Sequence, residues 1–150
     1  MSPSAVQVAG TVVQVFGALL TLVVTPAVLI LGGRPERIAV LASLAAYLLT
    51  PMVQAWAGSW PDWPLAVLVV DASLCALLVR LLIRYDREWL SAAVGVEAFT
   101  VLTDLSTVLD RTVTYRGYVV HSWAYYLVFL VVLAFSLVEV RWRRARGLDA

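Results

Sequence analysis

The sequence contains no lysine, one cysteine and one histidine. Without a lysine amine, the chain cannot form the Schiff base that retinal and pyridoxal phosphate require, nor a Walker phosphate loop. The single Cys75 can make neither an internal disulfide nor a zinc site. The single His121 excludes haem ligation by two histidines of one chain. These absences remove several classes of cofactor chemistry, and we expect no cofactor, no metal and no enzymatic activity.

Charge is also scarce. Charged residues make up 14% and hydrophobic residues 62% of the 150 residues, whereas soluble domains have about a quarter charged residues. A soluble chain this short could not bury so much apolar surface. The first ten residues lack the basic region of a secretory signal, so we expect the first apolar run to be a retained helix. Composition therefore predicts an integral membrane protein.

Five apolar segments are long enough to cross a bilayer. They predict an all-α transmembrane bundle of about five helices, forming a single integral membrane domain over residues 1–150. Pro26 is expected to bend the first helix near its end, and Pro51 to kink or uncoil the last turn of the second. Turns are expected at residues 32–37 and 84–89. The segments span residues 5–31, 38–57, 65–83, 89–109 and 118–140.

In a chain of five spans, successive connections alternate between the two sides of the membrane and so form two sets. The arginines are distributed unevenly between these two sets. Arg111 and Arg116 belong to one set, and the other nine arginines belong to the other set. Arginine-rich loops stay in the cytoplasm, so we expect the N-terminus outside and the C-terminus inside. Aromatic residues are expected to mark the interfaces. Those of the outer interface are Trp56, Trp60, Trp63, Tyr115 and Tyr118, and those of the inner interface are Tyr85, Trp89 and Trp142.

The first segment carries one face of small and hydrogen-bonding residues. Such a face typically packs against another membrane helix; the alternative is the lining of a polar pore. The face consists of Gln7, Gly10, Thr11, Gln14, Gly17, Ala18, Thr21 and Thr25.

The carboxylates inside apolar segments are the main candidates for function. Glu97, Thr100, Asp104 and Thr107 share one helical face, which we expect to contact protein, unless this segment lies partly in the interface. At 1.5 Å per residue, Asp71 lies about 10 Å, Glu97 about 18 Å and Asp104 about 8 Å from the outer end of its helix. These depths predict one intramembrane polar cluster, composed of Gln14, Asp71, Glu97 and Asp104, with His121 as a further candidate member.

Three roles for this cluster remain open. A charge in hydrocarbon costs about 2.5–3.5 kcal/mol, so we expect Glu97 to hold a proton or to pair with a donor. The cluster is then a hydrogen-bonded knot between helices, a proton or cation relay, or a contact with another subunit. A relay would also need polar groups that continue through the cytoplasmic half of the membrane. In that half we expect only Glu139 and arginines.

Two further features could bind a partner. His121 is a possible ligand for a metal or a pigment magnesium, the alternative being an interfacial histidine bonded to a loop carbonyl or to Asp104. The basic tail is interpreted as a cytoplasmic anchor flanking the last helix, with anionic lipid or nucleic acid as other binding partners. It consists of Arg141, Arg143, Arg144 and Arg146.

Several stretches resemble uncharacterised small multi-pass inner-membrane proteins of alphaproteobacteria. They are Gly32-Gly33-Arg34-Pro35-Glu36-Arg37, Val70-Asp71, Arg84-Tyr85-Asp86-Arg87-Glu88-Trp89, Leu102-Thr103-Asp104-Leu105 and Ser122-Trp123-Ala124-Tyr125. The resemblance implies a multi-pass protein of the bacterial inner (cytoplasmic) membrane and no known activity. In such proteins we expect histidine at the position of Asp104, so this chain departs from them at a candidate site residue.

These observations favour a non-enzymatic accessory or assembly subunit of a larger inner-membrane complex, respiratory or photosynthetic. Its partners would be the lipid bilayer and other membrane subunits, or further copies of itself, and not nucleic acid. One alternative is a small proton- or ion-conducting oligomer that uses Asp71, Glu97 and Asp104. The other is a pigment- or metal-binding membrane protein that uses His121.

Overall fold

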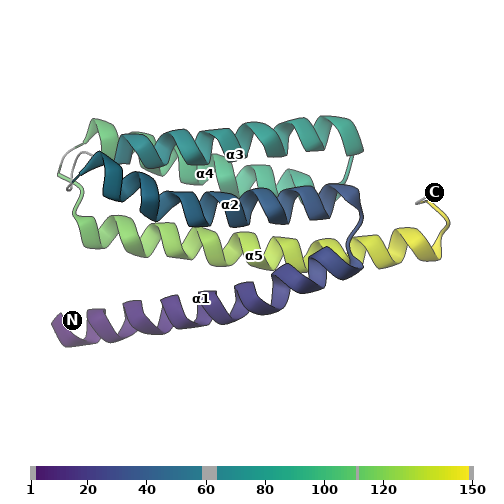
Figure 1. The fold of residues 1–150 in the computed structure, drawn as a ribbon, viewed down its shortest axis with the longest axis horizontal. Helices are drawn as coiled ribbons and strands as arrows, with labels where there is room; N and C mark the ends of the chain where they lie inside the picture. Colours follow the sequence, from purple (N-terminus) through teal and green to yellow (C-terminus); the bar gives the residue numbers. More distant parts are fainter. Residues whose placement is uncertain (1–2, 59–63, 111, 149–150) are drawn as a thin grey trace.

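The computed structural model describes residues 3–58, 64–110 and 112–148, and in this part the chain forms five α-helices and no strand (Figure 1). All five helices are long and apolar enough to cross a membrane. The prediction of an all-α bundle with five helices of spanning length is confirmed. The helices are α1 Pro3–Leu31, α2 Arg34–Ala57, α3 Pro64–Tyr85, α4 Glu88–Leu109 and α5 Tyr115–Ala145.

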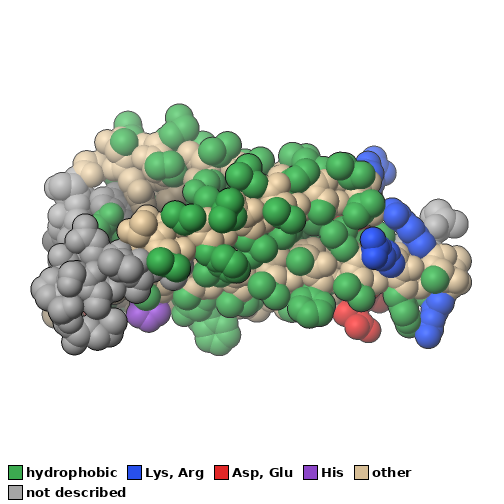
Figure 2. All heavy atoms as spheres, turned by 90° about the horizontal axis from the view of Figure 1, so that it is seen from below, with side chains coloured by type: hydrophobic (Ala, Val, Ile, Leu, Met, Phe, Trp, Pro, Cys, Tyr) green, Lys and Arg blue, Asp and Glu red, His purple; other side chains and the backbone are tan. Residues whose placement is uncertain are grey.

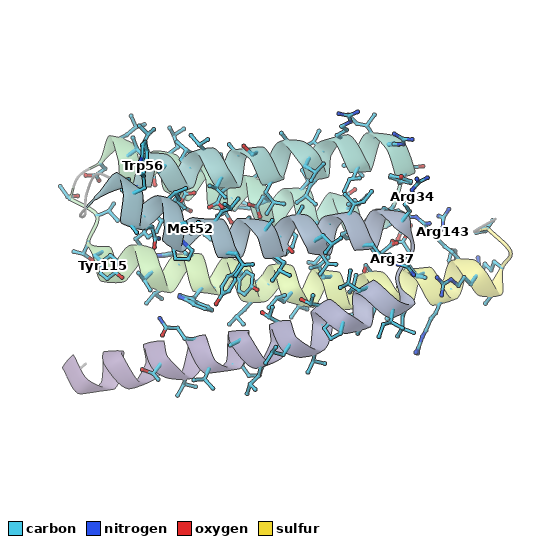
Figure 3. The ribbon with its side chains drawn as sticks, viewed as in Figure 1. Arg34, Arg37, Met52, Trp56, Tyr115 and Arg143 are labelled. Atoms are coloured by element: carbon cyan, nitrogen blue, oxygen red, sulfur yellow. The ribbon has the colours of Figure 1, made fainter. Side chains whose placement is uncertain are left out.

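The helices run up and down, so that the two chain termini lie at opposite ends of the bundle (Figure 1). The α1–α2 and α3–α4 connections and the C-terminus lie at one end, where blue side chains gather in Figure 2. Arg34, Arg37 and Arg143 are labelled there, opposite Trp56 and Tyr115 (Figure 3). We call these ends the arginine end and the N-terminal end. The segregation of charge predicted from the sequence is therefore present along the bundle axis.

The helices do not all contact one another equally. α3 packs against both α2 and α4, α4 packs against α5, and α1 rests mainly on α5, whereas α2 and α5 make little contact. The main core contains Leu78, Leu90, Leu130 and Leu133 and lies toward the arginine end. A smaller cluster around Val67 lies near the N-terminal end. Among the described side chains, packing is thus more complete in the arginine half of the bundle.

Two glycines connect α1 to α2. A Cβ on Gly32 would lie 2.4 Å from the Val28 carbonyl oxygen, and a Cβ on Gly33 would lie 2.8 Å from Glu36 Oε2. The chain can approach itself this closely only without side chains at these positions. The predicted turn is too long, because α2 already begins at Arg34, with proline in its first turn.

Both internal prolines are accommodated within continuous helices. α1 continues past Pro26, and Figure 1 shows its final part turning toward the other helices. α2 continues past Pro51 to Ala57. The predicted uncoiling of the last turn of α2 is therefore wrong.

The polar face of α1 packs against α5 over part of its length. Gly17 is buried against Trp123, and the hydroxyls of Thr21 and Tyr126 are hydrogen-bonded at 2.7 Å. Nearer the N-terminus, Thr11 and Gln14 are exposed. The predicted packing seam is present where α1 approaches α5. The side chains of Gln7 and Gly10 lie outside the part of the chain that can be described.

Candidate functional site

A cavity of about 370 Å³ lies in the N-terminal half of the bundle, where α2 and α5 make little contact. Its apolar lining includes Leu74 and Phe129. All five helices contribute side chains to the lining of this cavity. Its smaller polar side chains are Gln14, Ser43, Thr50, Gln54, Asp71, Glu97, Thr100 and Ser122.

Asp71 of α3 and Asp104 of α4 form a carboxyl pair beside this cavity. Their side chains lie within hydrogen-bonding reach of each other, and Tyr118 donates its hydroxyl to Asp104 Oδ1 at 2.7 Å. Asp104 Oδ2 has no protein donor among the described residues. Two carboxyls can hydrogen-bond only when they share a proton. The pair therefore joins three helices through one proton and one tyrosine hydroxyl.

Glu97 is placed differently from this pair. Its side chain is only 6% exposed, yet it lines the cavity. No hydrogen bond or ion pair joins its carboxyl to another described residue. The predicted face of α4 does contact protein, because Asp104 and Thr107 are buried as well. Glu97 is thus a buried carboxyl that lines the cavity and has no hydrogen-bond partner among the described residues.

Aromatic rings form another wall of the cavity. The rings of Tyr47 and Tyr126 are stacked, with centroids 5.2 Å apart. The ring of Trp123 lies nearly perpendicular to both, with centroids 6.3 Å from Tyr47 and 5.9 Å from Tyr126. Sequence analysis missed this group, although Tyr47, Trp123 and Tyr126 are the aromatics whose spacing places them toward the middle of α2 and α5.

The remaining predicted cluster members are distributed as follows. Gln14 is exposed at the edge of the same cavity. His121 is exposed on α5, where its Nδ1 is hydrogen-bonded to the Gly117 carbonyl at 2.8 Å, and it does not line the cavity. The structure therefore brings the three acids and Gln14 to one site and leaves His121 outside it. Binding of a metal or pigment by His121 stays a prediction.

Tyr118 and Trp89, which were assigned to the membrane interfaces, are both buried within the bundle, and their depth in the membrane stays a prediction. Tyr118 is 3% exposed and Trp89 is 5% exposed. Trp56 and Tyr115 are exposed as expected for the outer belt. Trp60 and Trp63 lie outside the described residues, as do Arg111 and the side chain of Arg116.

Trp89 belongs to a second buried polar group, at the arginine end. Its indole Nε1 donates to Glu36 Oε1 at 3.0 Å, and its backbone N–H donates to Glu139 Oε2 at 3.1 Å. The expectation that only Glu139 and arginines occupy the inner half missed Glu36, which is fully buried. The available signal was a glutamate at the third position of a helix that begins after two glycines.

The basic tail continues α5 beyond the other helices (Figure 1). The 31 residues of α5 make a rod of about 46 Å, longer than the hydrocarbon thickness of about 30 Å. The guanidinium of Arg146 lies 3.8 Å from the ring centroid of Trp142. This geometry suits a tail outside the hydrocarbon, and its role as an anchor stays a prediction. Its other arginines are Arg141, Arg143 and Arg144.

The site combines carboxyls, aromatic faces and amide groups around an open volume. Among the described residues, no three histidine, cysteine, aspartate or glutamate side chains are grouped so that they could hold a metal ion. A search of protein-family models, curated proteins and solved structures found no match to this chain. The resemblance to alphaproteobacterial inner-membrane proteins stays a prediction.

Proposed function

We propose that this protein binds a small molecule inside the membrane, in the cavity between α2 and α5, as a binding protein and not as an enzyme. Ligand pockets in proteins measure about 300–1,000 Å³ and combine apolar walls with a few polar groups. The cavity of about 370 Å³ has this composition. The observation that carries the proposal is Glu97, a buried carboxyl that faces this space without a partner in the described protein.

The packing of the arginine half favours binding over conduction through one chain. Leu78, Leu90, Leu130 and Leu133 are at most 2% exposed and fill the space beyond the cavity. The buried hydroxyls of Ser43 and Ser136 both bond to carbonyls of their own helices, at 3.0 and 2.7 Å. A proton or ion would find no continuous polar path through the described residues. The cavity is therefore best suited to a ligand that enters and leaves on the same side.

The orientation and location of the protein belong to the same proposal. With the arginine end in the cytoplasm, the cavity lies in the outer half of a bacterial inner membrane. The segregation of arginines along the bundle supports this orientation. A ligand would then come from the outer side or from the outer leaflet.

A cavity-filling substitution tests the proposal. Ala46 lines the cavity, whereas its neighbour Ala45 is exposed outside it. We expect native mass spectrometry of gently purified protein to detect a bound small molecule in the parent and in Ala45→Trp. In Ala46→Trp, which fills the cavity, the bound molecule should be absent. Equal occupancy in the two variants, or an empty parent protein, would count against binding in this cavity.

A second candidate function is that of an accessory or assembly subunit. Thr11 and Gln14 are exposed on the part of α1 that extends away from the bundle. Polar side chains on a spanning helix favour contact with another membrane helix. Mass measurement of the complex purified from its native membrane tests this function, because a subunit should retain a stoichiometric partner. A monomer in that measurement would contradict it.

A further inference from the structure

The cavity differs from a general apolar pocket in the sign of its charge. Asp71 and Glu97 are among its lining residues, and Asp104 contacts Asp71 from just behind the wall. No arginine or histidine is present in the described lining. Every arginine of α2 to α4 lies toward the other end of its helix. Among the described lining residues, the only side chains that can carry charge near neutral pH are carboxyls, so they can compensate the charge of a cation and not that of an anion.

The walls indicate which kind of cation fits. The three acids are not grouped closely enough to coordinate a metal ion. Tyr47, Trp123 and Tyr126 instead supply aromatic rings to the lining in two orientations, a stacked pair and a ring perpendicular to it. Aromatic faces attract organic cations such as quaternary ammonium groups, most strongly when water is excluded. The volume of about 370 Å³ admits such a group together with an apolar body.

We infer that the cavity binds a singly charged organic cation, with Glu97 as its counter-ion and the rings of Tyr47, Trp123 and Tyr126 as its contact surface. This inference rests on the proposed binding function and specifies its ligand class. Glu97 is available for this role because it has no partner in the described protein, whereas Asp71 and Asp104 already bind each other.

The same geometry makes the cation compete with a proton. A bare carboxylate is costly in the hydrocarbon region, so the empty cavity holds a proton on Glu97, and the arriving cation displaces it to solvent. Binding therefore weakens as pH falls. Other titratable side chains lie around the cavity on the packed helices. They are Tyr47 of α2, Asp71 and Cys75 of α3, Asp104 of α4 and Tyr115, Tyr118, Tyr125 and Tyr126 of α5.

The test uses benzyltrimethylammonium as the probe and benzenesulfonate as an anion of similar shape. Isothermal titration calorimetry of the purified full chain in detergent should detect binding of the cation only. The affinity should rise from acidic to alkaline pH, with a proton released into the buffer on binding. Binding of both probes alike, or displacement of the cation by equimolar sodium chloride, would overturn the inference.

Matched variants locate the binding. Glu97→Gln should weaken binding by about tenfold or more and remove the proton release, whereas Glu88→Gln, at an exposed position of the same helix, should change neither. Tyr47→Leu should weaken binding by a smaller factor, and Phe135→Leu, exposed on α5, should not change it. Unchanged binding in Glu97→Gln would overturn the inference.

Two further measurements distinguish a folding defect from a loss of binding, and a wrong ligand class from a wrong binding function. If Glu97→Gln does not give a cooperative melt, Glu97→Asp and the pH series of the parent decide the question, since a carboxyl at position 97 should retain both binding and proton release. Loss of either in a folded Glu97→Asp would contradict the inference. If the probe fails while Ala46→Trp still loses a native neutral or anionic molecule, the proposed function stands and the cation assignment is wrong.

Discussion

The two ends of the bundle hold buried carboxyls in opposite settings. At the arginine end, Glu36 accepts a hydrogen bond from an indole and Glu139 accepts one from a backbone N–H, and packed leucines lie next to them. At the N-terminal end, Asp71 and Glu97 line open space. A carboxyl is thus a structural link where donors and packing surround it, and our proposal makes it a binding group where they do not.

The largest expected effect concerns the packed half. Leu90 is fully buried, so Leu90→Ala should lower the free energy of unfolding by about 2–5 kcal/mol, because the removed side chain leaves a cavity. Reversible unfolding in mixed micelles measures this quantity. Leu41→Ala, on the exposed face of α2, is the control and should change it little. Equal losses in the two variants would contradict the location of the core.

The second prediction compares the hydrogen bonds at the two ends. Trp89→Phe removes the indole N–H that donates to the fully buried Glu36, and should cost about 1–3 kcal/mol of unfolding free energy. Tyr118→Phe removes a donor to Asp104, which keeps Asp71 as a neighbour, so about 0.5–1.5 kcal/mol is expected. The same unfolding measurement applies. A larger loss at Tyr118 would reverse the comparison.

The third prediction concerns the carboxyl pair. Asp71→Leu removes the group that shares a proton with Asp104, and should cost about 1–2 kcal/mol. Asp71→Asn supplies an amide donor in its place and should keep most of that stability. Thermal melts of the two variants give the comparison. Identical melts for Asp71→Leu and the parent would show that the pair does not stabilise the fold.

The smallest effect is expected at a carboxyl outside the bundle. The hydroxyl and backbone N–H of Thr112 donate to Asp110 Oδ1 at 2.7 and 2.9 Å and hold the pKa of Asp110 below its ordinary value. Because the folded pKa is the lower one, the contribution to stability is present above the unfolded pKa and is lost as pH falls through the folded pKa. Thr112→Val should raise the pKa of Asp110 in a carboxyl NMR titration. An unchanged titration would mean that the hydroxyl has no effect.

The sequence predicted the helices better than their contacts. Run length and loop charge predict five spans because lipid imposes both on each segment separately. The helical spacing of Glu97 and Asp104 likewise predicts a protein-facing side of α4. The bond between Trp89 and Glu36 could not be read in this way, because its partners are 53 positions apart in the chain. The burial of Tyr118 could not be read from the sequence either, because tyrosine suits an interface and a buried hydrogen bond equally well.

The length of α5 has a practical consequence for establishing the sidedness of the membrane. Its final turns stand clear of the other helices, and they contain the trypsin-sensitive bonds after Arg143 and Arg144. Trypsin added to sealed vesicles should remove the last few residues only when this end faces the bath. The digested protein would then have different masses in inverted and in right-side-out vesicles. This difference gives the orientation of the protein in the membrane without a fused tag.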